Sequence, residues 1–176
     1  LDRAWREQGA CVVGVGAGAS LLSEHVVADG ATDVHPRLGL VALEPGLGFF
    51  NRIIVDHHYC ERQRLGRLLS IVAREPTLLG VGVDVKTALL VDPGRGLEVL
   101  GEGTVTVFDG RQLTYSSVRK QNAGDDPILA LCNVQLNLLP AGFSFRVAQR
   151  KPPPGIFGSR IPPSLVDLVK QVVGTR

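Results

Sequence analysis

A glycine-rich run, Gly-Val-Gly-Ala-Gly-Ala-Ser at residues 14–20, constrains the fold of this chain more than any other feature. An apolar stretch, residues 10–13, precedes it, and a helical pattern begins near Ser20. A strand, a tight glycine turn and a helix form the layout of a nucleophile elbow, in which a strained turn presents a reactive side chain above a sheet. The residue at the tip is Gly16, which has no side chain. The sequence therefore predicts a catalytic frame without its reactive atom.

The first third of the chain is expected to hold one central strand between two helices. Residues 10–16 are apolar without alternation, which is typical of a strand buried in a parallel sheet. The first nine residues resemble the end of an amphipathic helix with Gly9 as its C-cap. We expect the second helix to continue from Ser20 to about Gly30, and we expect residues 30–51 to be irregular because they are rich in proline and glycine.

Residues 53–55 predict a short buried strand that delivers Asp56, His57 and His58 at its carboxyl end. Open α/β sheets bind ligands at that edge. Residues 60–73 have helical periodicity, and Glu75-Pro76 ends the helix.

Strands are also predicted in the remainder of the chain. Residues 80–91 predict two strand pieces around Asp84, and residues 129–139 predict a further strand. The pair Asp109-Gly110 predicts a hairpin between residues 97–107 and 112–118, because Asp-Gly favours a tight primed turn. Beyond a lobe at 1–150, we expect a proline-rich linker at 151–163 and a short amphipathic helix at 164–176 that docks on another surface.

Composition excludes several classes of protein. With 176 residues and 44% hydrophobic content, one core and one domain are expected. A net charge of +2 and 5% aromatic residues give no nucleic-acid footprint, and no apolar run reaches the ~20 residues that span a membrane. Cys11, Cys60 and Cys132 lack metal-ligand spacing, so no metal or other cofactor is expected, and their odd number favours the reducing cytoplasm.

Three motifs together carry a family resemblance. GVGAGAS, DHHYCERQRLGRLL at 56–69 and GVGVDVKTALLV at 80–91 resemble the cyanophycinase and dipeptidase-E family of serine peptidases. In that family these motifs read G-T-S-A-G-A, D-Q-H-F-x-x-R-x-R-x-G-R-L and G-I-G-I-D-E-x-T-A. The match is ungapped within each motif and covers about residues 1–150. It implies an α/β fold: a three-layer, glutamine-amidotransferase-like sandwich with a flavodoxin-like parallel sheet and a β-hairpin extension, lacking the family's N-terminal strands.

The resemblance also implies a degenerate catalytic triad. Gly16 stands where the family has its nucleophilic serine, His58 where it has its base, and Val85 where it has its glutamate; Ala17 stands at the oxyanion position. Glycine offers no nucleophile, and valine offers no acceptor for an imidazole N–H. We therefore expect a pseudoenzyme that binds or supports rather than cleaves. The alternative is an active hydrolase of β-aspartyl-arginine peptides that uses other residues or a partner's nucleophile.

Three nearby residues are candidates to substitute for the missing groups. Ser20 lies one helical turn past Gly16, so a serine on a helix face is favoured over a nucleophile. For Cys60 a packed thiol is favoured over a reactive one. Asp84 is interpreted as a structural carboxylate, with orientation of His58 as the alternative. The glycine spacing fits neither a Walker A loop nor a dinucleotide fingerprint.

In the family, the second motif lines the substrate site. The resemblance therefore implies that Asp56, His57, Arg62, Arg64 and Arg67 surround a ligand, and guanidinium groups suit carboxylates and aspartyl peptides. The competing interpretation is an ion-pair network, for instance between these arginines and Asp56 or Glu61, that fixes the helix.

The last expectation concerns assembly. A parallel sheet that lacks its first strands leaves apolar faces and strand edges open. We therefore expect a second chain that supplies the N-terminal half of the fold, with a homodimer as the lesser possibility.

Overall fold

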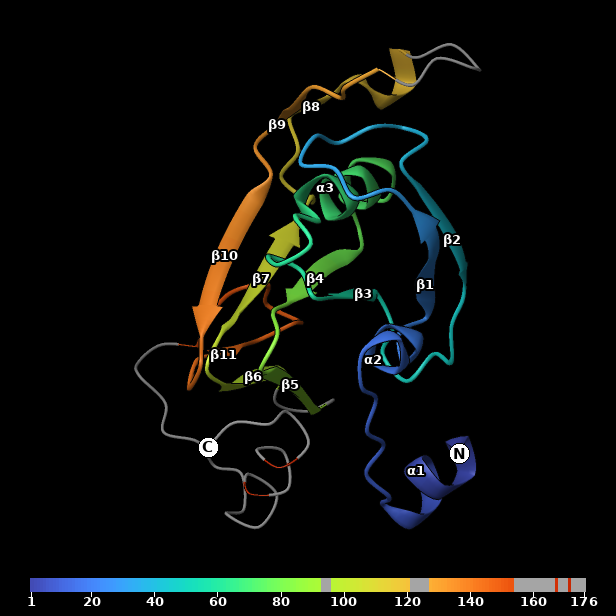
Figure 1. The fold of residues 1–176 in the computed structure, drawn as a ribbon, viewed down its shortest axis with the longest axis vertical. Helices are drawn as coiled ribbons and strands as arrows, with labels where there is room; N and C mark the ends of the chain where they lie inside the picture. Colours follow the sequence, from blue (N-terminus) through green and yellow to red (C-terminus); the bar gives the residue numbers. More distant parts are fainter. Residues whose placement is uncertain (93–95, 121–126, 154–166, 168–170, 172–176) are drawn as a thin grey trace.

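The structure, a computed structural model, describes residues 1–92, 96–120, 127–153, 167 and 171. Its centre is a four-stranded sheet with the order β10-β7-β4-β3 (Figure 1). The pair β3–β4 is parallel, and β7 pairs antiparallel with both β4 and β10. The bounds are β3 Ile53–His57, β4 Leu79–Val83, β7 Thr104–Asp109 and β10 Gln135–Pro140.

Two apolar clusters cover the two faces of this sheet. Helix α3 (Leu65–Arg74) packs on one face, where Ile54 contributes to its cluster. On the other face Ile53 and Val55 pack with Leu97, Val99 and Phe145. These last residues belong to a three-stranded antiparallel sheet of β11 (Ser144–Phe145), β6 (Gly96–Gly101) and β5 (Thr87–Asp92). Because side chains alternate along a strand, one strand serves both clusters.

Smaller elements surround this centre. Helix α1 (Asp2–Gln8) is followed by α2 (Ala17–Leu21) and by an antiparallel hairpin of β1 (His25–Gly30) and β2 (Val41–Pro45). In Figure 1 this hairpin lies beside α3, whereas α1 lies at the opposite end of the molecule from β8 and β9. The pair β8 (Tyr115–Ser116) and β9 (Leu131–Cys132) is antiparallel, and a 3₁₀ turn, η1, spans Ser117–Lys120.

A close contact holds the turn after β3 against the sheet. A Cβ at Gly82 of β4 would lie 2.3 Å from the ring of Tyr59. Tyr59 is buried in the α3-side cluster, and its ring lies tilted against that of Phe108 with the centroids 6.1 Å apart. Only glycine at position 82 leaves room for this ring, so the turn that carries His58 is fixed by packing.

The prediction of a central strand at 10–16 is wrong for this structure. These residues form no ladder, and Val13 and Val15 are 60% and 65% exposed. Apolarity predicted burial, but a strand also needs a paired neighbour, and the described part of the chain offers residues 10–16 none.

The prediction of a helix from Ser20 to Gly30 is also wrong beyond Leu21. Helix α2 ends at Leu21, and residues 25–30 form β1, whose His25 pairs with Pro45. The region 30–51 is therefore less irregular than expected. Tertiary pairing of β-branched residues outweighed the helical pattern here.

The predicted Asp109-Gly110 hairpin does not form. Strand β7 ends at Asp109 and pairs with β4 and β10, not with residues 112–118. A primed turn needs positive φ at its central residues, and Gly110 does not adopt it. Instead, a Cβ at Gly110 would lie 2.5 Å from Val72, so this glycine permits close packing against α3.

Other predictions are confirmed. The N-terminal helix ends at Gly9 with φ 68°, and strands lie on both sides of Asp84. The helix expected at 60–73 begins later, at Leu65, because a turn occupies 59–64. The strand predicted at 129–139 is split into β9 and β10.

The mixed α/β class is as predicted. Among the described residues, every helix is too short or too polar to cross a membrane. The proposed linker at 151–163 and helix at 164–176 lie almost wholly outside the described residues.

Candidate active site

The glycine turn has the positive φ and the following helix of a nucleophile elbow, but no strand precedes it in the described part of the chain. Gly16 has φ 57° and ψ −124° and is the N-cap of α2. A Cβ at this position would meet nothing within 4 Å, whereas a Cβ at Gly14 would lie 2.4 Å from the carbonyl oxygen of Gly18. Ala17 is the first residue of α2, so its N–H has no acceptor within the helix. The turn thus has space for a side chain at Gly16 and an Ala17 N–H without an acceptor in the helix, but it has no nucleophilic atom.

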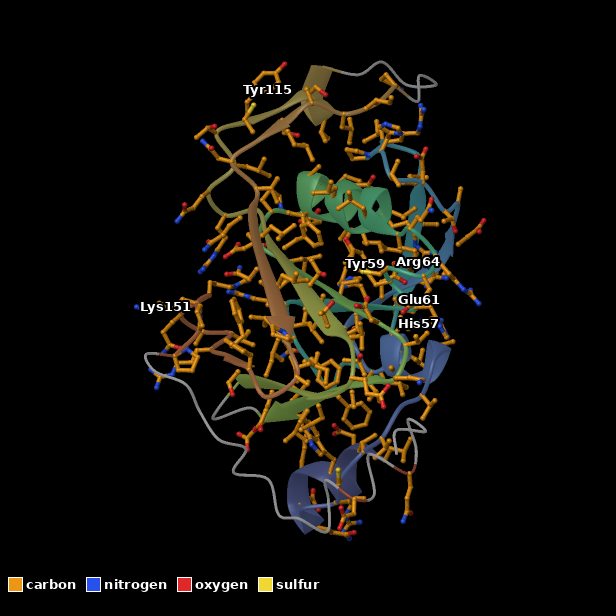
Figure 2. All side chains as sticks on the ribbon, turned by 60° about the vertical axis from the view of Figure 1, so that its left-hand side comes forward. His57, Tyr59, Glu61, Arg64, Tyr115 and Lys151 are labelled. Carbon is orange, nitrogen blue, oxygen red and sulfur yellow. The ribbon has the colours of Figure 1, made fainter. Side chains whose placement is uncertain are left out.

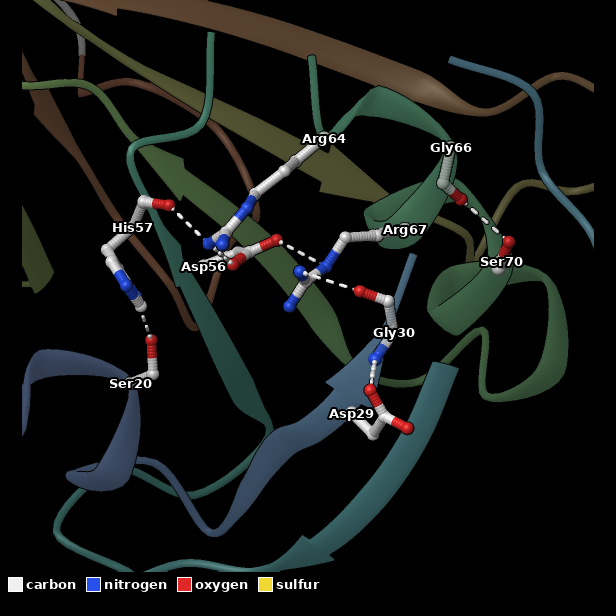
Figure 3. A network of polar contacts seen from close by, with 9 residues as sticks. All are labelled: Ser20, Asp29, Gly30, Asp56, His57, Arg64, Gly66, Arg67 and Ser70. Atoms are coloured by element: carbon white, nitrogen blue, oxygen red, sulfur yellow. Dashed lines mark hydrogen bonds and ion pairs between the residues drawn. The ribbon is translucent and has the colours of Figure 1, made fainter. Parts of the chain in front are cut away.

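The end of β3 brings Asp56 into a buried ion-pair network (Figure 3). Its Oδ1 lies 2.7 Å from Nη1 of Arg64, and its Oδ2 lies 3.1 Å from Nε of Arg67. Arg64 also donates to the carbonyl of His57 at 2.6 Å, and Arg67 to that of Gly30 at 3.4 Å. Burial raises the pKa of Asp56, and the two guanidinium groups oppose that shift.

These contacts favour the structural interpretation of two of the three arginines. The side chains of Arg64 and Arg67 are nearly inaccessible and are engaged with Asp56. Arg62 is exposed and has no ion-pair partner among the described residues. Ligand binding by Arg62 therefore stays a prediction, whereas Arg64 and Arg67 fasten α3 to the end of β3.

His57 points toward α2, not toward the elbow tip. Its Nδ1 lies 3.0 Å from Oγ of Ser20, which is buried (Figure 3). Burial, with Arg64 as the next cause, lowers the pKa of His57 from 6.5 to about 4. The ring is therefore neutral at neutral pH. This Ser–His contact joins two residues that the sequence did not connect.

His58 lies on a strained turn directly after β3. Its φ is 50°, and its carbonyl accepts a hydrogen bond from N of Arg62 at 3.1 Å. The rings of His57 and His58 meet edge to face at 5.3 Å. A non-glycine residue in this conformation is uncommon and often belongs to a functional site.

Asp84 is a structural carboxylate, as favoured from the sequence. Its Oδ1 accepts from N of Cys60 at 3.2 Å, and its Oδ2 accepts from N and Oγ1 of Thr104 at 3.2 and 2.6 Å. Cys60 is exposed, so the prediction of a packed thiol is wrong; the turn leaves it at the surface. Partial burial nonetheless raises its pKa to about 11, which keeps it protonated.

Val85 is 38% exposed and offers only its backbone. Its N–H donates to Oε1 of Glu61 at 3.0 Å. Glu61 lies near His57, Tyr59 and Arg64 in Figure 2, far from Tyr115 and Lys151. From the sequence, Glu61 is predicted only as a possible partner of the arginines. Its contact with Val85 is not predictable, because it depends on how the turn after β3 packs against the turn after β4.

Such a glycine elbow, with a histidine at the end of the adjacent strand, is the frame of a serine peptidase site. The family model described as "Peptidase family S51" matches residues 1–99. The chain belongs to this family.

Three cyanophycinases show the same relationship. The chain is 37% identical to that of Geminocystis herdmanii over 143 residues, which cover 81% of this chain and 52% of the relative. It is 35% identical to that of Trichormus variabilis over 145 residues, covering 82% and 48%. It is 36% identical to that of Synechococcus elongatus over 129 residues, covering 73% and 39%. The chain thus spans about half the length of the first relatives.

Proposed function

We propose that this chain is a catalytically inactive, cyanophycinase-like subunit that binds or scaffolds rather than cleaves. The observation that carries this proposal is the residue at the tip of the turn: Gly16 has a φ of 57° but no side chain. Val85 likewise has no carboxylate to orient His58. Without a nucleophile, the acyl-enzyme route of a serine peptidase is closed. A three-layer, glutamine-amidotransferase-like sandwich is the fold we propose for the complete assembly.

The same proposal includes a protein partner that docks beside the elbow and the open edge of β3. Val13, Val15 and Leu21, all close to the elbow, are large apolar side chains exposed to solvent. Strand β3 also ends the four-stranded sheet among the described residues. Apolar surface beside an open strand edge supports strand addition by a partner. A homodimer is the lesser alternative.

A ligand of this site would carry carboxylate and guanidinium groups, as β-aspartyl-arginine does. The exposed Arg62 supports the carboxylate part of such a ligand, since Arg64 and Arg67 are engaged with Asp56. The relatives' name, cyanophycinase, points to the same substrate class.

Activity assays test the proposal directly. The full-length protein is incubated with β-aspartyl-arginine and with a fluorophosphonate that labels active serines. We expect neither turnover nor labelling, and we expect Gly16→Ser to introduce labelling that His58→Ala removes. Turnover or labelling of the unaltered protein that disappears in His58→Ala overturns the inactive assignment.

One observation favours the alternative of an active hydrolase. Oγ of Ser20 lies 3.0 Å from Nδ1 of His57, which is the contact a nucleophile makes with its base. Two facts weaken this alternative: Ser20 is buried, and a histidine with a pKa of about 4 is a weak base. Turnover that is lost in Ser20→Ala and retained in His58→Ala would support this alternative.

A further inference from the structure

The turn that carries His58 is joined to the segment that carries Val85 by three successive contacts. N of Tyr59 donates to the carbonyl of Val83 at 3.2 Å. N of Cys60 donates to Oδ1 of Asp84 at 3.2 Å, and N of Val85 donates to Oε1 of Glu61 at 3.0 Å. Residues 59–61 therefore meet residues 83–85 in order, so the Glu61 carboxylate is held at the residue where the family's acid stands.

Asp84 is not free to serve as an acid for His58. Both of its oxygens accept hydrogen bonds, from Cys60 and from Thr104. Glu61 differs, because only Oε1 is engaged; among the described residues, Oε2 has no hydrogen-bond partner. The imidazole of His58 likewise has no hydrogen-bond partner in the described part of the chain. Glu61 is thus the nearby carboxylate with an oxygen left to accept from a histidine.

We propose that Glu61 replaces the missing triad acid and acts as a positioning residue for His58. A triad acid fixes the orientation of the imidazole and stabilises the imidazolium that forms when the base takes a proton. Here Oε2 of Glu61 accepts the N–H of His58, while Oε1 stays on the N–H of Val85. The two side chains do not bond in this structure, and the proposal requires them to meet when a ligand is bound. Both are accessible enough to rotate, and such contacts often tighten only when a ligand binds.

This proposal deepens the proposed function, because it implies that the nucleophile alone is missing. With serine at position 16, His58 takes the hydroxyl proton as Oγ attacks the acyl carbon, and it returns that proton to the leaving amine. Glu61 remains ionised throughout. Among the described residues, the His58 ring contacts that of His57, at 5.3 Å between the ring centroids.

A direct test follows the ring N–H protons of His58 by NMR in the full-length protein with β-aspartyl-arginine present. Glu61→Gln keeps an oxygen that accepts from Val85 but removes the charge. A charge-assisted hydrogen bond to Glu61 gives a strongly downfield ring N–H proton, and we expect Glu61→Gln to abolish that downfield position. Glu102→Gln is the matched control, because Glu102 is an exposed carboxylate paired with Lys86, and it should leave this signal in place. A downfield His58 signal that persists in Glu61→Gln, or that is absent from the unaltered protein, overturns the proposal.

A second test uses the Gly16→Ser background and the rate of fluorophosphonate labelling. We expect Glu61→Gln to lower that rate at least ~10-fold, and Glu61→Asp to restore part of it. Glu102→Gln should have no effect. If the unaltered protein is itself labelled and the NMR signal is lost in Glu61→Gln as expected, the proposed inactivity fails while the Glu61 assignment stands. If labelling occurs and is insensitive to Glu61→Gln, the Glu61 assignment fails alone.

Discussion

Two buried aspartates at opposite ends of the central sheet have nearly the same surroundings. Asp56 is the last residue but one of β3 and is 1% exposed, and Asp109 ends β7 and is 2% exposed. Each is bound by two arginines from segments that follow it: Asp56 by Arg64 and Arg67, and Asp109 by Arg111 and Arg150. Asp56 lies next to the candidate catalytic histidines, but Asp109 does not.

The two clusters show that an aspartate between two arginines mainly links neighbouring segments of this fold by ion pairs. Arg64 and Arg67 hold α3 to β3, as Arg150 holds the segment after β11 near β7 and Thr77. The clusters differ in one respect: both arginines on Asp56 are buried, whereas Arg111 on Asp109 is 45% exposed. Retained arginines in the second motif are therefore not by themselves evidence of ligand binding.

The largest expected effect comes from removing the carboxylate of Asp56. Asp56→Asn leaves two buried guanidinium groups without a counter-charge, and we expect the free energy of unfolding to fall by roughly 3–5 kcal/mol. Asp109→Asn leaves only one buried guanidinium, so a smaller loss, about 2–3 kcal/mol, is expected. Urea unfolding followed by circular dichroism measures both. Equal losses of unfolding free energy in the two variants would contradict the proposed difference between the Asp56 and Asp109 clusters.

The next effect is a pH dependence that only the Asp56 cluster should have, because His57 borders it. The pKa of His57 is lowered from 6.5 to about 4, so the unfolded chain binds a proton in this window and the folded chain does not. Stability is therefore full above pH 6.5 and falls as the pH drops toward 4. Allowing for solvent around a partly exposed ring, the loss is about 1–2 kcal/mol. Urea midpoints across this range measure it, and His57→Gln should remove this part of the slope. An identical slope in His57→Gln contradicts the assignment.

The smallest expected effect is at Arg111. Its guanidinium is half exposed and lies 3.1 Å from Asp109, so Arg111→Ala should lower stability by about 1 kcal/mol or less. Arg64→Met, the buried counterpart in the other cluster, should lower it by about 3 kcal/mol or more. Thermal melts of both variants sharpen the comparison. A loss for Arg111→Ala as large as that for Arg64→Met would show that burial does not set the strength of these pairs.

The sequence predicted those elements whose burial follows from local pattern. Ile53 to Val55 are apolar and β-branched and end at a carboxylate, so strand β3 and the position of Asp56 could be predicted. Residues 10–16 have the same apolar pattern, but a strand is defined by its neighbour, and pattern alone does not supply one. Gly110 was interpreted as a turn residue although it is required by contact with Val72. Glycine is thus typical both of tight turns and of close packing between segments, and the local sequence does not distinguish the two.

The site was predicted in part for the same reason. The motifs assign roles to Gly16, His58 and Val85 by number, and these roles stay predictions; the structure gives Gly16 a positive φ at the start of α2. The contacts of Glu61 with Val85 and of Ser20 with His57 join residues 24 and 37 positions apart. Such contacts depend on the register between loops, which periodicity does not encode.

The backbone conformation at Gly16 also affects the stability cost of exchanging serine and glycine at this position. With φ 57° and ψ −124°, a serine there is held in a conformation that L-residues disfavour by ~1–3 kcal/mol, whereas glycine adopts it freely. In the inactive subunit that we propose, a glycine in place of the serine releases this strain and adds stability. A return to serine would cost that stability again, although a Cβ at position 16 would meet nothing within 4 Å.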